Sequence, residues 1–334
     1  MRKGNVTKEN HKGTVAGIGS VLMDILVSAD DSLVEKTGAQ KGGMTYVDPV
    51  MIEKILSMTS QAPVIVSGGS ACNTLMGVGK LGGTARFVGK KGQDPMGDLF
   101  TEELKRSQVE PLLLTSSSPT GRVLSVITPD AQRTMFTFLG ASAEAQASEI
   151  SEKYFAGADI VHVEGYLLFS RELITGALKA AKNARARISL DLASFTVVEH
   201  AKDFLDTLAG EYVDILIANE DEARAFTGYA DEAEALKVMS ENAEIAVIKI
   251  GERGSLVSCR GQTVKISALR GAPIVDTTGA GDLWASGFLY GLANGYSPEK
   301  AGELGAWCGY EVCRVVGAKI PEEGWERIRN HFSI

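Results

Sequence analysis

Strand-length apolar runs alternate with helical patterns along most of the chain, and this alternation constrains the fold more than any other feature. The runs are continuously apolar, which is typical of strands covered on both faces. They lie at residues 14–19, 85–89, 159–165, 187–193, 213–219 and 244–251, and helical patterns occupy 70–81, 96–107, 171–184, 197–209, 220–227 and 232–240. The alternation predicts βαβ units, and therefore an α/β fold in three layers, with helices on both faces of a mostly parallel central sheet.

Two segments, about 25–48 and 110–139, interrupt this pattern with apolar and polar residues in turn. In the second segment, the run GRVLSVITPDAQRTMFTFLG places a PDA turn between two strand-like halves. This arrangement predicts a small antiparallel sheet with one solvated face. We expect the two segments to form one lid over a site, in a single domain that spans residues 1–334 with 1–13 as a flexible tail.

Composition narrows the range of partners. The chain of 334 residues carries a formal net charge of −8 at pH 7, which argues against binding to nucleic acid or to an anionic membrane. No apolar run approaches the roughly 18 residues of a membrane span, and the polar start of the chain has no signal-peptide pattern. The four cysteines form no CxxC pair, which favours free thiols in a reducing compartment. We therefore expect a cytoplasmic protein that acts on a small molecule.

Polar residues follow four of the predicted strands, where open α/β sheets bind their ligands. The first group is GIGSVLMD at 17–24. It fails as a dinucleotide fingerprint because Leu22 stands where the third glycine belongs. Asp24, at its end, is either a ligand-binding carboxylate or the cap of a turn.

The second and third groups each precede a predicted helix. In SGGSACN, Gly68 and Gly69 either let a ligand approach the helix N-terminus or form a tight turn, and Asn73 supplies a donor and an acceptor. In NEDE, Asn219 is a good helix N-cap, and the acids suit a first helical turn. Alternatively, Asn219 and Glu222 face the sheet edge and hold a hydrated magnesium ion.

The fourth group, VDTTGAGD at 275–282, follows apolar residues 273–275 that predict the end of a strand. Two glycines at the mouth of a helix make an anion site from backbone amides and the helix dipole. A carboxylate beside that site would repel an anion, so Asp282 indicates a base that accepts a proton from an attacking hydroxyl. Further along the same helix, Gly287 and Gly291 predict close packing on the sheet.

At these residues the chain resembles the ribokinase family of ATP-dependent kinases, the PfkB-type carbohydrate kinases. DTTGAGD at 276–282 is similar to the second signature of that family, and residues 67–97 are similar to the first. The resemblance extends from about Thr14 to the C-terminal helices. It implies a ribokinase-like α/β/α sandwich with a small β-sheet lid, and transfer of the ATP γ-phosphate to a hydroxymethyl group.

The resemblance also implies roles for the polar strand ends. Asp282 would be the catalytic base. The anion hole for the migrating phosphoryl group would be formed by the amides of Gly279, Ala280 and Gly281, and the acceptor would be bound by Asp24, Gly68, Gly69 and Asn73. This division suits phosphoryl transfer, in which catalysis is mostly positioning and stabilisation of charge.

The nucleotide and its ions would lie at the third and fourth groups. Asn219 and Glu222 match the family's NxxE, which implies magnesium held through water. KIGERG, from Lys249, resembles the TxGxxG nucleotide loop, but lysine replaces the usual threonine and puts a hydroxyl contact to phosphate in doubt. The implied ATP contacts are Asn219, Lys249, Gly251, Gly254, Thr278, Gly279 and Gly281. A potassium ion would be bound by carbonyl oxygens of Asp276, Thr278 and the 315–317 turn.

Several stretches are most similar to the adenosine-kinase branch of the family, among them GGSACNT, QRTMFTFLGAS and VEGYLLFS. In the second stretch, Arg133 is followed by Met135, Thr137 and Leu139 on one strand face, and the arginine could also reach a phosphate. In the third, Tyr166 or Phe169 could stack on a purine, although lid core packing explains these aromatics equally well. The resemblance therefore implies phosphorylation of a nucleoside, adenosine to AMP.

Other interpretations stay open at this point. A free sugar such as ribose or fructose would be phosphorylated by the same chemistry. A dinucleotide-dependent oxidoreductase built on Gly17–Asp24 lacks one glycine, and a nucleotide-binding regulator would not need the acid at Asp282. A monomer and a homodimer are both compatible with the sequence.

Overall fold

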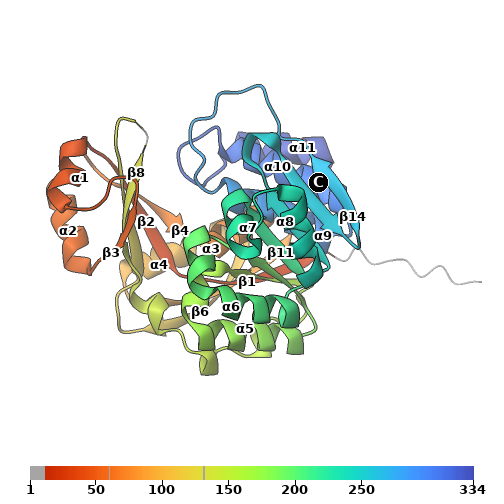
Figure 1. Ribbon diagram of the computed structural model, residues 1–334. Helices are drawn as coiled ribbons and strands as arrows, with labels where there is room; N and C mark the ends of the chain where they lie inside the picture. The colour runs from red at the N-terminus through yellow and green to blue at the C-terminus, as the bar shows by residue number, and fades with distance from the viewer. Residues whose placement is uncertain (1–11, 60, 131) are drawn as a thin grey trace, which may run out of the picture.

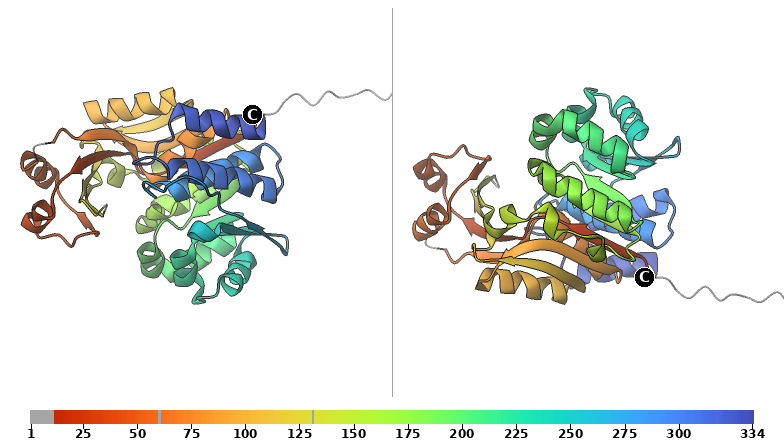
Figure 2. Two further views of the ribbon diagram at one scale, coloured as in Figure 1. Left: turned by 90° about the horizontal axis from the view of Figure 1, so that it is seen from above. Right: turned by 90° about the horizontal axis from the view of Figure 1, so that it is seen from below.

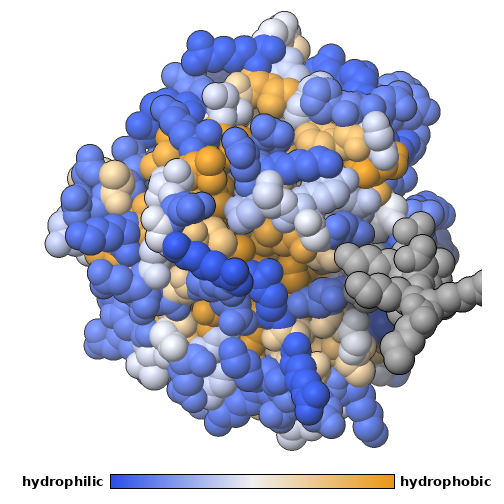
Figure 3. Space-filling view, turned by 90° about the vertical axis from the view of Figure 1, so that its right-hand side faces the viewer, coloured by the Kyte–Doolittle hydropathy of each residue, from blue (hydrophilic) through white to orange (hydrophobic). Residues whose placement is uncertain are grey.

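The computed structural model describes residues 12–59, 61–130 and 132–334. Most of the predicted flexible tail, 1–13, lies outside the described residues. At the end of that stretch, the backbone N–H of Gly13 donates to Asn294 Oδ1 at 3.1 Å. No helix within the described ranges is long and apolar enough to cross a membrane. On the side of the molecule shown in Figure 3, the surface is mostly hydrophilic and has smaller apolar areas.

In the described part of the chain, nine strands form one large sheet in the order β14-β13-β12-β11-β10-β9-β1-β5-β6. Neighbours from β12 to β6 are parallel, and only the pairs that involve β13 are antiparallel. The mostly parallel sheet predicted from the apolar runs is confirmed. Its strands are β1 (Thr14–Ile18), β5 (Thr84–Gly92), β6 (Val109–Ser116), β9 (Ile160–Glu164), β10 (Arg187–Asp191), β11 (Ile215–Asn219), β12 (Ile245–Lys249), β13 (Ser255–Cys259) and β14 (Gln262–Ile266).

Helices cover both faces of this sheet, and Figure 2 shows the green helices and the blue helices on opposite sides. Alternate strand residues explain the arrangement: Leu216 and Ala218 pack with one helical layer, whereas Ile215 and Ile217 pack with the other. The first layer contains α5 (Arg171–Asn183), α6 (Phe195–Tyr212), α7 (Glu220–Thr227) and α8 (Glu232–Asn242). The second contains α3 (Ser70–Lys80), α4 (Pro95–Arg106), α9 (Ala280–Ala293), α10 (Pro298–Val312) and α11 (Glu322–Phe332).

A smaller sheet of five strands, all within the described residues, stands at one end of the large one (Figure 1). Its order is β3-β8-β7-β2-β4, and one face packs on α1 (Asp31–Thr37) and α2 (Pro49–Ser57). The predicted hairpin around the PDA turn is confirmed, because β7 and β8 pair antiparallel. The strands are β2 (Leu22–Ser28), β3 (Met44–Tyr46), β4 (Val64–Gly68), β7 (Gly121–Ile127) and β8 (Arg133–Phe138).

The small sheet differs from its prediction in extent and direction. It is mixed, since β2 is parallel to β7 and β3 is parallel to β8. The segment at 110–139 starts too early, because β6 pairs with β5 as the edge strand of the large sheet. As an edge strand, β6 is exposed or half-buried along almost its whole length, and polar residues therefore interrupt its apolar run. The segment at 25–48 is too short, since the sheet also contains β4.

The glycines of α9 allow close packing on a helix, whereas the sequence predicted close packing on the sheet. A Cβ on Gly287 would lie 2.6 Å from the carbonyl oxygen of Leu304 in α10, and one on Gly291 would lie 2.8 Å from the Ala301 Cβ. These contacts leave no room for a methyl group without a shift of the α10 backbone.

We expect Gly287→Ala to lower the free energy of unfolding by about 2 kcal/mol, because overpacking forces the two helices apart. Urea unfolding followed by far-UV circular dichroism measures the change. Gly210→Ala in α6 is the matched control, since among the described residues beyond its own helix backbone its added Cβ meets only Asn242 Oδ1, at 3.8 Å. Helix propensity should make that variant more stable, by about 0.5–1 kcal/mol. Equal stability of the two variants would contradict the packing argument.

Candidate active site

One cavity of about 1500 Å³ opens at the carboxyl ends of the parallel strands, and residues of the small sheet also line it. Four neighbouring strands, β9 to β12, each contribute their last residue: Glu164, Asp191, Asn219 and Lys249. The register places Glu164 opposite Asp191 and Asn219 opposite Lys249. Two acids, an amide and an ammonium group therefore lie together at the carboxyl edge of the large sheet. This is the edge at which open α/β sheets bind their ligands.

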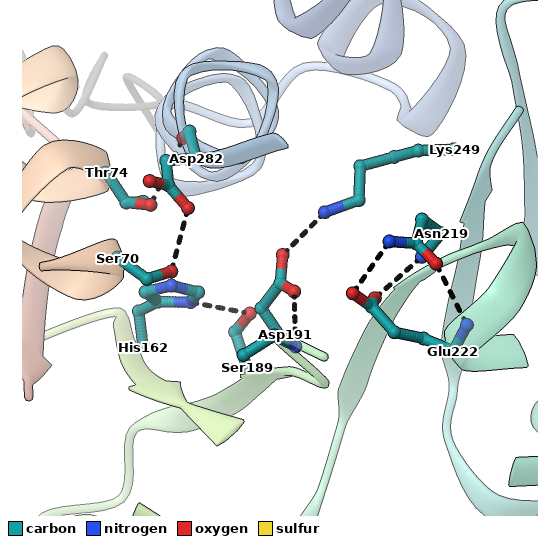
Figure 4. A network of polar contacts seen from close by, with 10 residues as sticks. Ser70, Thr74, His162, Ser189, Asp191, Asn219, Glu222, Lys249 and Asp282 are labelled. Carbon is teal, nitrogen blue, oxygen red and sulfur yellow. Dashed lines mark hydrogen bonds and ion pairs between the residues drawn. The ribbon is translucent and has the colours of Figure 1, made fainter. Parts of the chain in front are cut away.

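Asp282 lies in the first turn of α9, where Ser70 of α3 contacts its carboxylate (Figure 4), and Asn73 of α3 also holds it. Ser70 Oγ donates to Oδ1 at 2.8 Å, and Asn73 Nδ2 donates to Oδ2 at 2.9 Å. Burial raises the pKa of Asp282 to about 6, and the bonds from Asn73 and Ser70 act in the opposite direction. A carboxylate with this pKa is ionised at neutral pH and can still accept a proton.

The loop before α9 requires glycine and presents its backbone to the cavity. Gly279 caps the helix with φ 72°, and a Cβ on it would lie 2.5 Å from the Ala318 Cβ. Gly279, Ala280 and Gly281 all line the cavity. The Ala280 amide donates to the Thr277 carbonyl at 3.1 Å. The predicted anion hole also includes the backbone amides of Gly279 and Gly281.

Asp276 ties this loop to the small sheet. Its Oδ1 accepts from the amide and hydroxyl of Thr278 at 3.1 and 2.9 Å, and its Oδ2 accepts from the Gly317 amide at 2.7 Å. Arg133 of β8 forms an ion pair with the same carboxylate. Burial would raise the pKa of Asp276, but the bonds from Gly317 and Thr278 and the charge of Arg133 lower it. Asp276 therefore joins three segments that are far apart in sequence.

The strand predicted to end at residues 273–275 does not form. These residues lie outside every described strand, and the Ile274 and Val275 side chains are exposed. The Val275 amide instead donates to the Cys313 carbonyl at the end of α10. Ile274 lines the cavity, so at least one apolar residue of this segment is part of the cavity wall and not of a strand.

Asn219 and Glu222 form the predicted helix cap and also face the cavity. They form a capping box, in which Glu222 accepts from Asn219 N and Nδ2 at 2.8 and 2.7 Å and Asn219 Oδ1 accepts from Glu222 N at 2.9 Å. Both also line the cavity. Burial and the nearby Asp191 raise the pKa of Glu222 to about 7.

The acceptor residues predicted from the sequence lie at the small-sheet end. Asp24 of β2 lines the cavity, and burial raises its pKa to about 7. Gly68 leaves room for that carboxylate, since a Cβ there would lie 2.4 Å from it. Gly69, with φ 91°, begins α3, and a Cβ there would lie 2.8 Å from the Ser20 carbonyl oxygen.

Most of the predicted site residues reach the cavity directly, and the others contact those that do. The direct lining includes Asp24, Gly69, Met135, Tyr166, Asn219, Glu222, Lys249, Gly251, Gly254, Gly279, Ala280, Gly281 and Asp282. Behind it lie Gly68 against Asp24, Asn73 on Asp282, and Arg133 and Thr278 on Asp276.

Two acids of the site were not predicted from the sequence. Asp191 Oδ2 accepts from Lys249 Nζ at 2.8 Å. Glu164 is buried and accepts from the amides of Ser20 and Ala71 at 2.8 and 3.1 Å, which fixes the start of α3. Each is the last residue of a strand, the same signal that singled out Asn219.

Comparison with known proteins agrees with this geometry. Residues 42–324 match the pfkB family carbohydrate kinase. An adenosine kinase structure from Sinorhizobium meliloti is 31% identical, with a TM-score of 0.87 and coverage of 96% of this chain and 100% of that one. A structure described as a "probable sugar kinase protein" from Rhizobium etli is 30% identical, with a TM-score of 0.88 and coverage of 97% and 99%.

A curated relative shows that the substrate varies among similar proteins. The 5-dehydro-2-deoxygluconokinase of Geobacillus thermodenitrificans is 30% identical over 255 residues, 72% of this chain and 76% of the relative. All three comparisons are with kinases, and the predicted resemblance and fold are confirmed. The chain belongs to the pfkB family of carbohydrate kinases and is an ATP-dependent phosphotransferase that acts on a sugar or nucleoside alcohol.

Proposed function

We propose that the protein is a nucleoside kinase that phosphorylates the hydroxymethyl group of adenosine to give AMP. The observation that carries this proposal is an apolar wall in the same cavity as Asp24. Tyr166 and Phe169 are large apolar side chains that are 37% and 51% exposed, and they line the cavity together with Met135 and Leu139. A flat heteroaromatic base would cover this apolar surface, while Asp24 would accept hydrogen bonds from sugar hydroxyls.

The charges around Asp24 favour a neutral acceptor. Its two nearest cations are already paired, Arg133 with Asp276 and Lys319 with Glu103. Among the described residues that line the cavity, the cations are Lys249, the first residue of the nucleotide loop, and Arg270, which precedes α9. An acceptor with its own carboxylate or phosphate would meet the carboxyl groups of Asp24, Glu164 and Asp282, and those that are ionised would repel it. The deoxygluconate in the name of the Geobacillus relative is such an acid.

In the proposed reaction, Asp24 holds the acceptor by its diol, and the hydroxyl of its hydroxymethyl group lies beside Asp282. Its oxygen forms a bond to the γ-phosphorus, the bond from that phosphorus to the oxygen of ADP breaks, and the hydroxyl proton moves to Asp282. The amides of Gly279 and Gly281 stabilise charge on the equatorial oxygens. Asn219 and Glu222 present oxygen atoms that would hold magnesium through water, and the bound ion would neutralise phosphate charge.

A free sugar is the second candidate acceptor. Asp24 and the space that Gly68 leaves beside it would bind a diol of ribose or fructose as readily as that of a nucleoside. The apolar wall would then contact nothing. The two candidates therefore differ in whether the wall contributes to catalysis.

Phosphate transfer from ATP with magnesium, measured across adenosine, inosine, ribose, fructose, fructose phosphates and 5-dehydro-2-deoxygluconate, tests the proposal. We expect kcat/KM for adenosine to exceed that of each other acceptor by about tenfold or more. Met135→Ala and Tyr166→Ala should each lower kcat/KM for adenosine by about tenfold and leave that for ribose unchanged. A free sugar as the best acceptor, or equal losses for adenosine and ribose, would reject the nucleoside assignment. Potassium dependence and the choice between monomer and homodimer stay predictions.

A further inference from the structure

The ammonium group of Lys249 lies beside the first turn of α9, where the phosphoryl group is expected (Figure 4). A Cβ built on Gly281 would lie 3.0 Å from Lys249 Nζ. The same nitrogen is 2.8 Å from Asp191 Oδ2, and the two side chains are 15% and 5% exposed. Both residues line the cavity. The lysine therefore reaches over the glycine-rich loop and is anchored there by a buried carboxylate.

The charge and the donors of this group fit a phosphate. Burial would lower the pKa of Lys249, but the carboxylates of Asp191 and Glu222 raise it above its ordinary value. The side chain is therefore a permanent cation that has three N–H donors. Asp191 accepts one of them, and the other two can meet the oxygens of a phosphoryl group at Gly279–Gly281.

We propose that Lys249 is a further catalytic residue, which contacts the γ-phosphoryl group during transfer and stabilises charge on its equatorial oxygens, and that Asp191 positions it. The threonine usual at this place in TxGxxG offers a neutral hydroxyl, whereas lysine offers a full positive charge. The proton balance of the reaction is unchanged, because the acceptor proton moves to Asp282 and Lys249 keeps its own. The proposal rests on phosphoryl transfer and does not depend on adenosine as the acceptor.

Lys249→Met removes the charge and keeps the length of the side chain. We expect kcat to fall by about 100-fold, the loss typical of one preorganised stabilising group. The KM of the acceptor should stay within about threefold, because the lost contact is made to the phosphoryl group. By calorimetry, affinity for the β,γ-imido analogue of ATP should fall, while affinity for ADP, which lacks the γ-phosphate, should not. Lys249→Arg, which retains the charge, should recover part of kcat.

If Lys249 had only a structural role, its replacement would also lower activity, because Asp191 would be left unpaired beside Glu222 and Asp282. The double variant Asp191→Asn with Lys249→Met separates the two explanations, because it removes both charges. In the single Lys249→Met variant the acid limb of the kcat profile should move to higher pH. Asp191 still raises the pKa of Asp282 there, and Lys249 no longer lowers it. The double variant should reverse this pH shift and still turn over about 100-fold slower than the wild type.

Recovery of the double variant to near wild-type kcat would overturn the proposal, as would equal losses of affinity for ADP and the imido analogue. Lys91→Met is the matched control, since Lys91 is 14% exposed, pairs with Asp98 at 2.7 Å and lies outside the cavity lining. Its kcat should equal that of the wild type. The assay uses whichever acceptor reacts fastest, so a failure of adenosine leaves the comparison intact. The two binding measurements need no acceptor, so they test Lys249 even if no alcohol is phosphorylated.

Discussion

Replacement of Asp282 by asparagine is expected to lower kcat by about 1000-fold and to leave ATP affinity nearly unchanged, because general-base catalysis contributes 10²–10⁴-fold. The carboxylate is held by Ser70 and Asn73 rather than by the nucleotide loop. Loss of its charge therefore removes the proton acceptor without removing a phosphate ligand. Steady-state kinetics with the best acceptor, combined with calorimetry of binding of the β,γ-imido analogue of ATP, measures both effects.

The pH dependence follows from the same group. The base must be ionised, so kcat/KM should fall as the pH drops through the pKa values of Asp282, about 6, and Asp24, about 7. The hydrogen bond from Ser70 lowers the pKa of Asp282. Ser70→Ala should therefore raise that pKa and move the acid limb to higher pH, while kcat at pH 8 changes little.

Asp94→Asn is the control for this experiment. Asp94 caps α4 by accepting from the Gly97 amide at 2.8 Å, and it lies outside the cavity lining. Its carboxylate also accepts from the amide and the hydroxyl of Thr120 at 2.7 Å, so this variant should lose some stability but keep its kcat. If Asp282→Asn retained a kcat near that of the wild type, Asp282 would have no part in the mechanism.

The layered fold was predictable because periodicity depends only on local burial. Continuous apolar runs located six strands of the large sheet, and helical spacing located the helices between them. The edge strands and the loops of the cavity rim were harder to predict from periodicity. β6 is an edge strand that is exposed or half-buried along almost its whole length, and its pairing with β5 is visible only in the three-dimensional structure. Residues 273–275 are apolar without being a strand, and one of them, Ile274, lines the cavity.

Site residues could be predicted where a polar side chain lies at the end of a strand. They were harder to predict where they depend on pairing between residues far apart in sequence. Asp24, Asn219 and the GAG loop were identified in this way. Asp191 and Glu164 occupy equivalent positions, but a strand end cannot be located to the residue from sequence, and both were included in apolar runs. The Arg133–Asp276 pair spans 143 residues of sequence and required the fold.

Asp24→Ala is expected to lower kcat/KM for the acceptor by about 1000-fold, since two hydrogen bonds to a charged group contribute about 1.5–3 kcal/mol each. The KM for ATP should change little, because Asp24 belongs to the small sheet and the nucleotide loop to the large one. Asp130→Ala is the control from the same sheet. Its carboxylate pairs with Lys41 at 2.6 Å on the surface, so its loss should leave the kinetics unchanged.

A substrate that lacks one hydroxyl tests whether Asp24 binds the diol. The wild type should prefer adenosine to 2′-deoxyadenosine by about tenfold or more, because the deoxynucleoside leaves one lone pair of the carboxylate without a donor. The Asp24→Ala variant has no carboxylate to satisfy, so it should accept both nucleosides at similar, low rates. If the variant kept the wild-type preference, the hydroxyl would be recognised by another group. Asp24 would then act on the acceptor only through its charge, and the diol would have to lie elsewhere in the cavity.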